Sequence, residues 1–478
     1  MDLKRQEIGK RIGNVGLWTV AIGVVLLMAV SYVISAKHIE MNPDVTYYTG
    51  VSKQILAGNI PYVDVKVDYT PLALYMTTIP VGIRGNSWTM IIGFMYLILF
   101  IAAAIEGLIV YHYTKNKALS VLGGGLLLLY AFMSEGVYFG LEAFVLLFGL
   151  GAFYCLITYK SKWQIAIAGI LCACAFWSKQ YGLGFAGICG LWILMQREIA
   201  WKEKGIQVAT LVGGFLGTIV IFAGYFILKG MQVGQLAPLI FGEGYGSYGA
   251  QGIVENGIWM FKRFPILLAA LAVIPFMQQE KRDWKVIVCS IIGICGFLLQ
   301  CYFRSFLHYL ILVWPFAILL TLYVVDAISH KYLKIGMYVL LLVFVLRMVP
   351  RVARMDKSIY NRTDRWEQMG IAKVMEDYVP KYSKNVYAYK PEMLYCQFYN
   401  DYTPPLMEKY GYNAGFYEED SISLELVREA DYVMTPSNLN EESPILSDAV
   451  QSVLDGEFEK LDVKKEEQVK GIIYTRKK

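Results

Sequence analysis

Three carboxylates and a lysine occupy a short stretch of sequence after the first long apolar run. Asp44 directly follows Asn42 and Pro43, a pair typical of a helix start, and Gly58 is typical of a helix end. The other charged residues follow in a Pro-punctuated loop: Asp64, Lys66 and Asp68. The helix dipole favours the charged form of a carboxylate at a helix start, which suits transient proton uptake or cation coordination. The alternatives are that Asp44 only complements the dipole and that an ordinary polar loop follows.

A second group of ionisable residues lies in or beside apolar segments. Glu142 falls inside one, where an ionisable side chain is costly and usually functional, although a helix–helix hydrogen bond would also explain it. Lys179 and Arg304 fall at the ends of apolar runs, where snorkelling or contact with lipid headgroups is the alternative to a functional role. For His308 the alternative is a satisfied interface histidine. Glu135, in the turn before Glu142, is expected to be exposed.

The elements that must position these residues are membrane helices. Of the 478 residues, 56% are hydrophobic and 17% are charged, and the mean hydropathy is +0.44, outside the range of ordinary globular proteins. Apolar runs of about 17 to 22 residues recur as far as Pro350. The sequence therefore predicts an α-helical polytopic membrane protein with about eleven transmembrane helices. They are expected at 15–36, 88–111, 117–133, 137–158, 164–178, 181–196, 206–228, 264–278, 285–301, 306–325 and 332–350.

The distribution of Lys and Arg predicts the orientation of these helices. Basic residues are concentrated in every second connection, which places those connections and the N-terminus in the cytoplasm. The basic N-terminus precedes an apolar run without a cleavage site, so a retained first span is expected. An odd number of spans puts the C-terminus outside. Two long segments, 37–87 and 229–263, are then external loops of a multi-pass protein of the cytoplasmic membrane.

Residues 351–478 form the second predicted domain, after a transmembrane domain at 1–350. A helix is expected at 365–379, and strands are expected at 385–389, 431–435 and 471–475. This pattern predicts a small soluble α/β domain, extracytoplasmic in the orientation above. Its single cysteine, Cys396, permits no disulfide within the domain.

Composition and motifs exclude several functions. The formal net charge is +5, but the basic residues lie in short clusters between apolar runs, as in loop anchoring, so nucleic-acid binding is not expected. The sequence has no cluster of metal ligands, no nucleophile elbow and no Walker motif. A cytosolic nucleotide-sugar enzyme is therefore unsupported.

Several short motifs occur in an order that resembles the GT-C glycosyltransferases, in particular the protein-mannosyltransferase, aminoarabinose-transferase and RgtA-like group. The first is an acid soon after the first span, followed by G-x-x-P-Y-x-D and a proline. The later ones are Gly140-Leu141-Glu142-Ala143, Trp177-Ser178-Lys179-Gln180-Tyr181-Gly182, and Arg304-Ser305-Phe306-Leu307-His308-Tyr309 with Pro315. The resemblance covers roughly 350 residues, and all of its motifs fall on the predicted external side.

The resemblance implies a GT-C-like fold whose external active site transfers a sugar from a polyprenyl-phosphate-linked donor. The acceptor would be a cell-envelope glycan, a lipid or a protein outside the cytoplasm. In that family the loop acid nearest the first span acts as general base or holds a metal, which implies this role for Asp44; Asp64 is the competing candidate. Val45 follows Asp44 where other members have an Asp–Glu pair. Dependence on a divalent metal, Mg or Mn, therefore stays open.

The donor phosphate needs cationic partners at the membrane interface. Lys179, Arg304 and His308 fall at predicted external helix ends, and Glu142 and Lys66 complete the predicted donor-binding set. A flexible loop carries Tyr245 and Tyr248, which could stack on sugar faces and close over a ligand. An aromatic interfacial belt is the alternative for these tyrosines.

Two other functions remain open at this point. A lipid or glycan transporter, or a flippase, would be expected to show paired repeats or broken helices with polar groups near mid-membrane. In this sequence the acids cluster in an external loop instead. A non-catalytic assembly subunit would be favoured if Asp44 proved dispensable.

Overall fold

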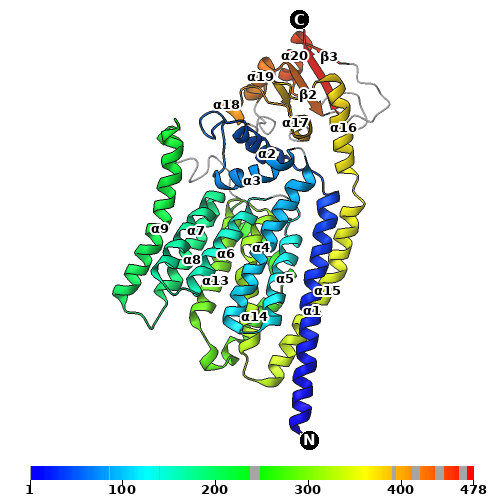
Figure 1. Ribbon diagram of the computed structural model, residues 1–478. Coiled ribbons are helices and arrows are strands. Elements are labelled where there is room, and N and C mark those ends of the chain that lie inside the picture. Colours follow the sequence, from blue (N-terminus) through cyan, green and yellow to red (C-terminus); the bar gives the residue numbers. More distant parts are fainter. Residues whose placement is uncertain are drawn as a thin grey trace. The chain divides into compact units, whose positions relative to one another are not determined.

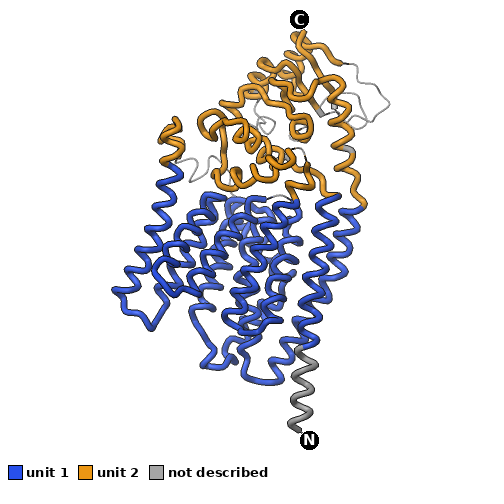
Figure 2. Tube along the Cα trace, viewed as in Figure 1, with its two compact units in different colours: residues 1–37, 93–223, 240–360 blue, residues 38–92, 224–239, 361–478 orange. Residues whose placement is uncertain are grey.

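The structure is a computed structural model that describes residues 2–85, 87–138, 140–236, 248–389, 394–411, 420–436, 446–461 and 471–477. The chain divides into two compact units (Figure 2). Unit 1 contains residues 1–37, 93–223 and 240–360, and unit 2 contains residues 38–92, 224–239 and 361–478. The first predicted external loop thus shares a unit with the C-terminal segment. The predicted two-domain division at residue 350 stays a prediction.

Unit 1 is a bundle of helices (Figure 1). Most of its helices pack on sequence neighbours, as α6 does on α7 and α13 does on α14, and α5 also packs on the distant α14. The α-helices are α1 (Asp2–His38), α4 (Trp88–Thr114), α5 (Lys117–Met133), α6 (Glu142–Ile157), α7 (Lys162–Ser178), α8 (Leu183–Leu194), α9 (Trp201–Leu228), α11 (Gly249–Arg263), α12 (Ile266–Val273), α13 (Trp284–Leu298), α14 (Trp314–Ala327) and α15 (Lys331–Tyr360). Short 3-10 helices are η1 (Gln180–Gly182), η3 (Ile274–Phe276), η4 (Gln279–Lys281), η5 (Leu299–Tyr302) and η6 (Leu307–Leu312).

Several of these helices can cross a membrane. Among the described residues, 5 helices are long and apolar enough to do so, or up to 6 if the bent pair α11 and α12 counts as one span. Five shorter apolar helices accompany them: Lys117–Met133, Glu142–Ile157, Lys162–Ser178, Gln180–Leu194 and Trp314–Ala327. Each of the eleven predicted ranges overlaps a described helix. A multi-pass helical protein is confirmed, whereas the number of spans and their orientation stay predictions.

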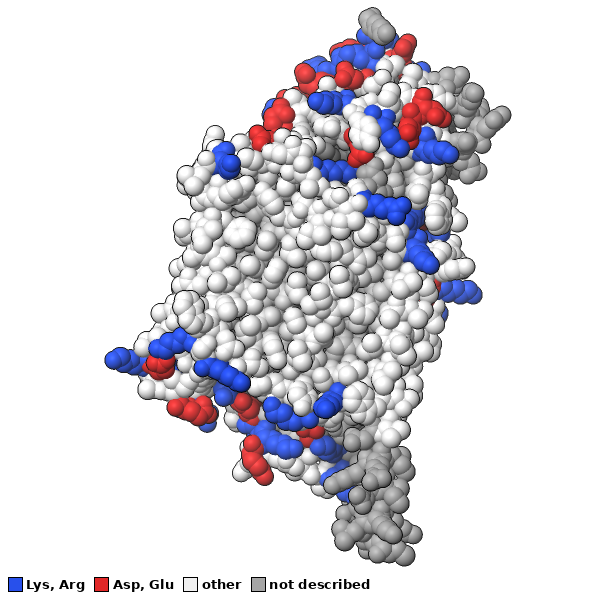
Figure 3. Space-filling view, in the orientation of Figure 1, with Lys and Arg blue, Asp and Glu red and all other residues white. Residues whose placement is uncertain are grey.

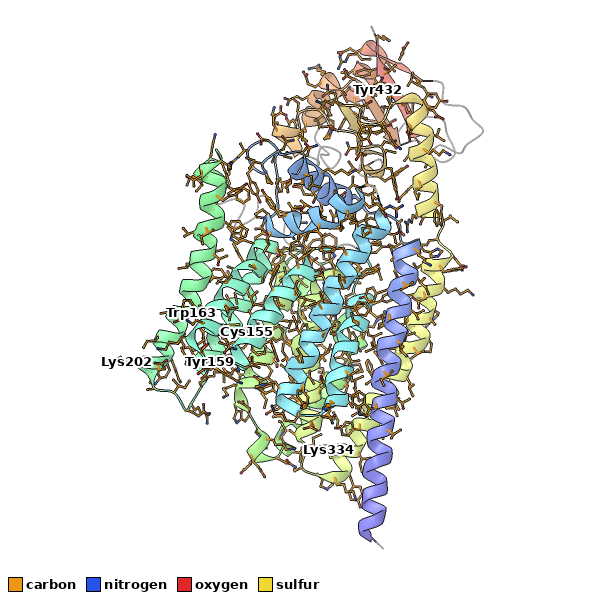
Figure 4. The ribbon with its side chains drawn as sticks, viewed as in Figure 1. Cys155, Tyr159, Trp163, Lys202, Lys334 and Tyr432 are labelled. Atoms are coloured by element: carbon orange, nitrogen blue, oxygen red, sulfur yellow. The ribbon has the colours of Figure 1, made fainter. Side chains whose placement is uncertain are left out.

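The surface of unit 1 agrees with a membrane setting. On the face shown in Figure 3, a wide band of unit 1 carries no Lys, Arg, Asp or Glu, and charged side chains gather at the end where α7 and α9 begin. Trp163 and Lys202 lie toward that end in Figure 4. Trp163 is 80% exposed and Trp201 is 75% exposed, and Nζ of Lys204 lies 4.3 Å from the Trp201 ring centroid. Exposed Trp beside Lys is typical of a membrane–water interface.

Two predicted spans begin later than expected, each for a local reason. The helix predicted at 137–158 begins at Glu142, because a turn precedes it in which Glu135 has a φ of 62°. The helix predicted at 306–325 begins at Trp314, with Pro315 in its first turn. Proline lacks an N–H and fits a helix start better than a helix interior. The preceding residues form the 3-10 helix η6 instead.

Unit 2 combines short helices with a small sheet. Its helices are α2 (Pro43–Leu56), α3 (Leu72–Arg84), η2 (Val233–Gln235), α16 (Asp364–Tyr378), α17 (Leu394–Asn400), α18 (Met407–Tyr410), α19 (Asp420–Glu429) and α20 (Asp448–Glu457). Its strands are β1 (Val386–Ala388), β2 (Tyr432–Pro436), β3 (Phe458–Lys460) and β4 (Gly471–Arg476). The predicted helix at 365–379 and the three predicted strands are confirmed within a residue or two. The prediction did not include α3, α17, α18, α19, α20 or strand β3.

The four strands form one sheet in the order β1-β2-β4-β3. Strands β1 and β2 are parallel, and β4 pairs antiparallel with β2 and with β3. Tyr432, labelled in Figure 4, begins β2 opposite Thr475 of β4. Buried side chains of the strands and of α19 and α20 pack together as an apolar core, which includes Val433, Leu454 and Phe458. Burial of this apolar surface stabilises the sheet.

Candidate active site

The structure brings four of the predicted donor-binding residues into one part of unit 1. Glu142 lies in the first turn of α6 and is 1% exposed. Its Oε1 accepts a hydrogen bond of 2.5 Å from Nζ of Lys179, the residue that ends α7, which is 7% exposed. Neither charge of such a pair can be removed alone without leaving the other uncompensated in a medium of low polarity.

His308 joins this pair to a second carboxylate. Its Nδ1 lies 3.3 Å from Oε2 of Glu135, and its Nε2 lies 3.9 Å from Oε1 of Glu142. Glu135 was expected to be merely exposed; its side chain is 43% exposed, but it contacts the imidazole. We call Glu135, Glu142, Lys179 and His308 the Glu142 cluster.

Two tyrosines line the same cluster. Nζ of Lys179 lies 4.7 Å from the ring centroid of Tyr309 and 5.8 Å from that of Tyr181, a distance at which a ring face attracts a cation. The two rings are 5.2 Å apart and edge to face. Arg304 lies within electrostatic range of Tyr181. A lysine, a histidine and two phenols therefore meet at the end of α7.

The backbone before α6 is shaped to place Glu142. A Cβ atom at position 140 would lie 2.7 Å from Oε2 of Glu142, so a larger residue there would require this carboxylate to shift. The hydroxyl of Tyr96 donates to the carbonyl of Val137, and Nε1 of Trp314 donates to Oγ of Ser134 at 2.9 Å. These contacts from α4 and α14 fix the turn from which α6 starts.

Asp44 lies in unit 2, in the first turn of α2. Oδ1 of Asn42 accepts the N–H of Val45 at 3.0 Å, and Pro43 occupies the start of the helix. The predicted helix start is confirmed. Asp44 itself is exposed, whereas residues 45–52, which follow it in α2, are all buried. The cap and this burial hold the helix, and Asp44 is an exposed residue of its first turn.

Tyrosines connect α2 to the loop that follows it. The hydroxyl of Tyr47 accepts the backbone N–H of Asp68 at 3.0 Å. The ring centroids of Tyr47 and Tyr48 lie 5.4 and 5.3 Å from that of Tyr69. Burial, together with the nearby Asp68 carboxylate, raises the pKa of Tyr47 well above its usual value. Tyr47 therefore stays protonated and acts as a neutral anchor of the loop.

Asp64 and Lys66 lie in this loop. Oδ2 of Asp64 accepts the N–H of Ile60 at 2.7 Å, so this carboxylate stabilises the fold of its own loop. The N–H of Lys66 donates to the carbonyl of Met407 at 3.4 Å. Gly411, with a φ of 64°, approaches the Lys66 carbonyl so closely that a Cβ atom would lie 2.4 Å from it. The loop is thus fastened to the segment around α18, and Lys66 belongs to unit 2 rather than to the Glu142 cluster.

The other end of α2 is held by an ion pair. Nζ of Lys53 pairs with Oδ1 of Asp401, donates to the carbonyl of Phe398 at 2.9 Å and lies 4.8 Å from the Phe398 ring centroid. Burial lowers the pKa of Lys53, and the carboxylate of Asp401 offsets part of this effect. Helix α2 is therefore fixed at both ends, by its own cap and by α17.

The two tyrosines predicted to stack on sugar faces, Tyr245 and Tyr248, belong to the second predicted external loop. Tyr245 lies outside the described residues. Tyr248 is 55% exposed, and its ring centroid is 6.3 Å from that of Phe306. In the part of the chain that the structure describes, no three His, Cys, Asp or Glu side chains gather closely enough to hold a metal ion.

The sequence-based prediction missed Glu135, Tyr181, Tyr309 and Asp68 as members of these groups. Tyr181 and Tyr309 stand two residues and one residue from predicted site residues, in motifs that had already been singled out. Glu135 could have been found from the seven-residue spacing to Glu142, which brackets a turn. Asp68 carries no signal beyond its place in the loop.

The fold has counterparts among solved structures. ArnT from Cupriavidus metallidurans bound to undecaprenyl phosphate is 13% identical with a TM-score of 0.64, and its apo state is 14% identical with a TM-score of 0.62; each match covers 94% of this chain and 97% of that chain. The Archaeoglobus fulgidus oligosaccharyltransferase tethered with an acceptor peptide is 13% identical, with a TM-score of 0.51, over 86% of this chain and 69% of that chain. No protein-family model and no curated protein matches the sequence.

These structures define the class of fold. ArnT is an aminoarabinose transferase, and both it and the oligosaccharyltransferase are GT-C glycosyltransferases. The chain has the fold of this class, as its motifs predicted.

Proposed function

We propose that the protein is a membrane glycosyltransferase that moves a sugar from a polyprenyl-phosphate-linked donor to an acceptor outside the cytoplasm. The observation that carries this proposal is the fold, which extends over 94% of this chain and 97% of the ArnT chain whose structure contains undecaprenyl phosphate. The oligosaccharyltransferase structure with a tethered acceptor peptide supports transfer to an acceptor. The acceptor class, a cell-envelope glycan, a lipid or a protein, is left to experiment.

Asp44 is the proposed general base. Its carboxylate takes the proton of the acceptor hydroxyl as the acceptor oxygen bonds to the anomeric carbon of the sugar. The bond between that carbon and the phosphate oxygen breaks, and polyprenyl phosphate leaves with the electron pair. Asp44 suits this role because it is exposed on a fixed helix start. Asp64 is the competing candidate, and its carboxylate accepts the N–H of Ile60.

The proposed phosphate-binding residues are Lys179, Arg304 and His308. A leaving phosphate is stabilised by charge-assisted hydrogen bonds. Glu142 positions Lys179, whose ammonium has three donors and can bond the carboxylate and a phosphate oxygen together. The rings of Tyr181 and Tyr309 hold the same ammonium from other sides.

The proposal includes the predicted orientation, with the N-terminus in the cytoplasm and the C-terminal segment outside. A reporter that is active only outside the cytoplasm, fused after Lys478, should be active. A reporter active only in the cytoplasm should be silent at the same position. The reverse pattern would contradict the external site.

The assignment of the base is tested with two matched variants. Asp44→Asn should keep thermal stability and donor binding but lower transfer by at least about 10²-fold. Asp64→Asn removes the same charge from the same loop and keeps an oxygen that can accept the N–H of Ile60, so it should mainly weaken donor or acceptor binding. Near-normal turnover of Asp44→Asn, or loss of activity only through unfolding, would transfer the role to Asp64.

A lipid transporter is the rival function, and one observation favours it. Helices α11 and α12 meet at an angle of 86°, and broken helices are typical of transporters. The two functions differ in their products. In liposomes a transporter would move intact donor lipid to the other leaflet without an acceptor, whereas a transferase releases polyprenyl phosphate only when an acceptor is present.

A further inference from the structure

Four arginines come together in unit 1, remote in sequence from the residues assigned to catalysis. Arg347, Arg351 and Arg354 follow one another on α15 at spacings of four and three residues, which places them on one face of the helix. Arg263 is the last residue of α11. Arg351 experiences the charges of all three others. We call these four residues the arginine cluster.

Packing of neighbouring aromatic rings places Arg263 beside α15. The ring centroid of Phe264 lies 5.9 Å from that of Phe344 on α15 and 5.0 Å from that of Tyr130 on α5. The hydroxyl of Tyr130 donates to the carbonyl of Arg263 at 3.1 Å. Buried aromatic contacts therefore hold the end of α11 beside α15 and α5.

The arginine cluster concentrates positive charge, and the guanidinium carbon of Arg263 lies 5.1 Å from the ring centroid of Trp259. Within the described residues, the ion pairs of arginine involve Arg362 and Arg476 and none of the four. Asp356 lies nine residues after Arg347, on the opposite face of α15, where its Oδ2 accepts a hydrogen bond of 2.7 Å from Ser31. Four like charges held together repel one another, and a bound anion would relieve that repulsion.

On the face of α15 that bears the arginine cluster, the residues that precede the cluster are apolar and exposed. Leu340 and Val343, at seven and four residues before Arg347, are 43% and 55% exposed. From Lys331 to Arg351 the helix rises about 30 Å, the thickness of the hydrocarbon core of a bilayer. An exposed apolar stripe thus ends in guanidinium groups at the depth where lipid phosphates lie.

We propose that the arginine cluster binds the phosphate group of an anionic phospholipid whose acyl chains lie along Leu340 and Val343. Guanidinium groups match phosphate oxygens with two parallel hydrogen bonds each. The apolar stripe selects a lipid over a free anion. This proposal concerns residues other than those assigned to catalysis and does not depend on glycosyl transfer.

The test compares the full-length protein with Arg351→Gln and with Lys202→Gln, which removes the same charge from an exposed lysine at the start of α9. Each is purified in a neutral detergent and titrated with phosphatidylglycerol, phosphatidylcholine, undecaprenyl phosphate or inorganic phosphate. Native mass spectrometry counts bound lipid, and thermal unfolding reports stability.

Phosphatidylglycerol should bind the native protein and Lys202→Gln equally, and Arg351→Gln at least about tenfold more weakly. Without lipid, Arg351→Gln should unfold at the same or a higher temperature than the native protein, because one repulsive charge is gone. A purely structural arginine would show the reverse: lower stability without lipid and unchanged lipid affinity.

Three other results would overturn the proposal. Equal binding of phosphatidylcholine would show that charge is not recognised. Equal protection by inorganic phosphate would show that the apolar stripe has no part. Preferential binding of undecaprenyl phosphate would assign the site to the carrier lipid instead of a phospholipid.

Discussion

The Glu142 cluster and the start of α2 hold their charged side chains in opposite ways. Glu142 and Lys179 come from different helices, are almost fully buried and fix each other. Asp44 is exposed, and its helix begins with a cap in which the side chain of Asn42 accepts the N–H of Val45, three residues later. The Glu142–Lys179 pair depends on distant parts of the chain, whereas the start of α2 depends on local geometry. A substitution should therefore affect stability most in the Glu142 cluster and activity most at Asp44.

The largest effect on stability is expected for Lys179→Met. It leaves Glu142 buried without a partner, which should lower the free energy of unfolding by about 3–5 kcal/mol. Thermal unfolding in detergent measures the loss. The double variant Glu142→Gln, Lys179→Met leaves no buried charge and should recover most of it. Equal losses in the single and double variants would show that the pair does not carry the stability of this region.

Arg304→Gln tests whether the residues around the Glu142 cluster also bind a phosphate. Arg304 is half-buried, so its loss should disturb folding little. Affinity for undecaprenyl phosphate should fall about tenfold, because a charge-assisted hydrogen bond is lost. Titration of the purified protein measures this, with Lys202→Gln as control. Unchanged affinity would return Arg304 to a snorkelling role.

The side chains of the Lys53–Asp401 pair are 19% and 17% exposed, so the pair is intermediate between the buried Glu142–Lys179 pair and the exposed Asp44. Lys53→Met should cost about 1–2 kcal/mol of unfolding free energy. The folded pKa of Lys53 lies below the unfolded value, so the unfolded state binds more protons between the two. The stability of the native protein should therefore rise relative to Lys53→Met as the pH approaches the ordinary lysine pKa from below. A constant difference between the two proteins would contradict the burial of this ammonium.

The smallest effect is expected for Asn42→Ala. Loss of the cap should lower stability by about 1 kcal/mol, whereas Asn42→Asp, which keeps an acceptor, should change it less. Hydrogen exchange of the α2 amides would localise the change. Identical exchange in both variants would mean that the buried tyrosine face alone holds α2.

The same contrast explains what could be predicted from the sequence. The start of α2 was predicted because Asn42, Pro43 and Asp44 carry its signal within three residues. The apolar runs likewise predicted each unit 1 helix that they overlap. Helix α3 was missed because its residues fell within a predicted polar loop. The helix is itself an apolar stretch that contains Pro80.

The contacts of the Glu142 cluster depend on residues far apart in the chain. The motifs indicated that Glu142, Lys179 and His308 matter, but not that Lys179 is neutralised by Glu142 or that Glu135 bonds His308. Those facts follow from the packing of α6, α7 and η6, which no local pattern contains. Strand β3 was missed for a related reason: three residues long, it is a strand only because β4 pairs with it.

The most direct test of the central claim is the stoichiometry of transfer. Purified protein is incubated with a panel of polyprenyl-phosphate-linked sugars and candidate acceptors, and mass spectrometry quantifies released polyprenyl phosphate and glycosylated acceptor. The account predicts equal amounts of both products, at least about 10²-fold less of each with Asp44→Asn, and normal folding of that variant. Movement of intact donor across liposomes without release of polyprenyl phosphate, or full activity of Asp44→Asn, would contradict it.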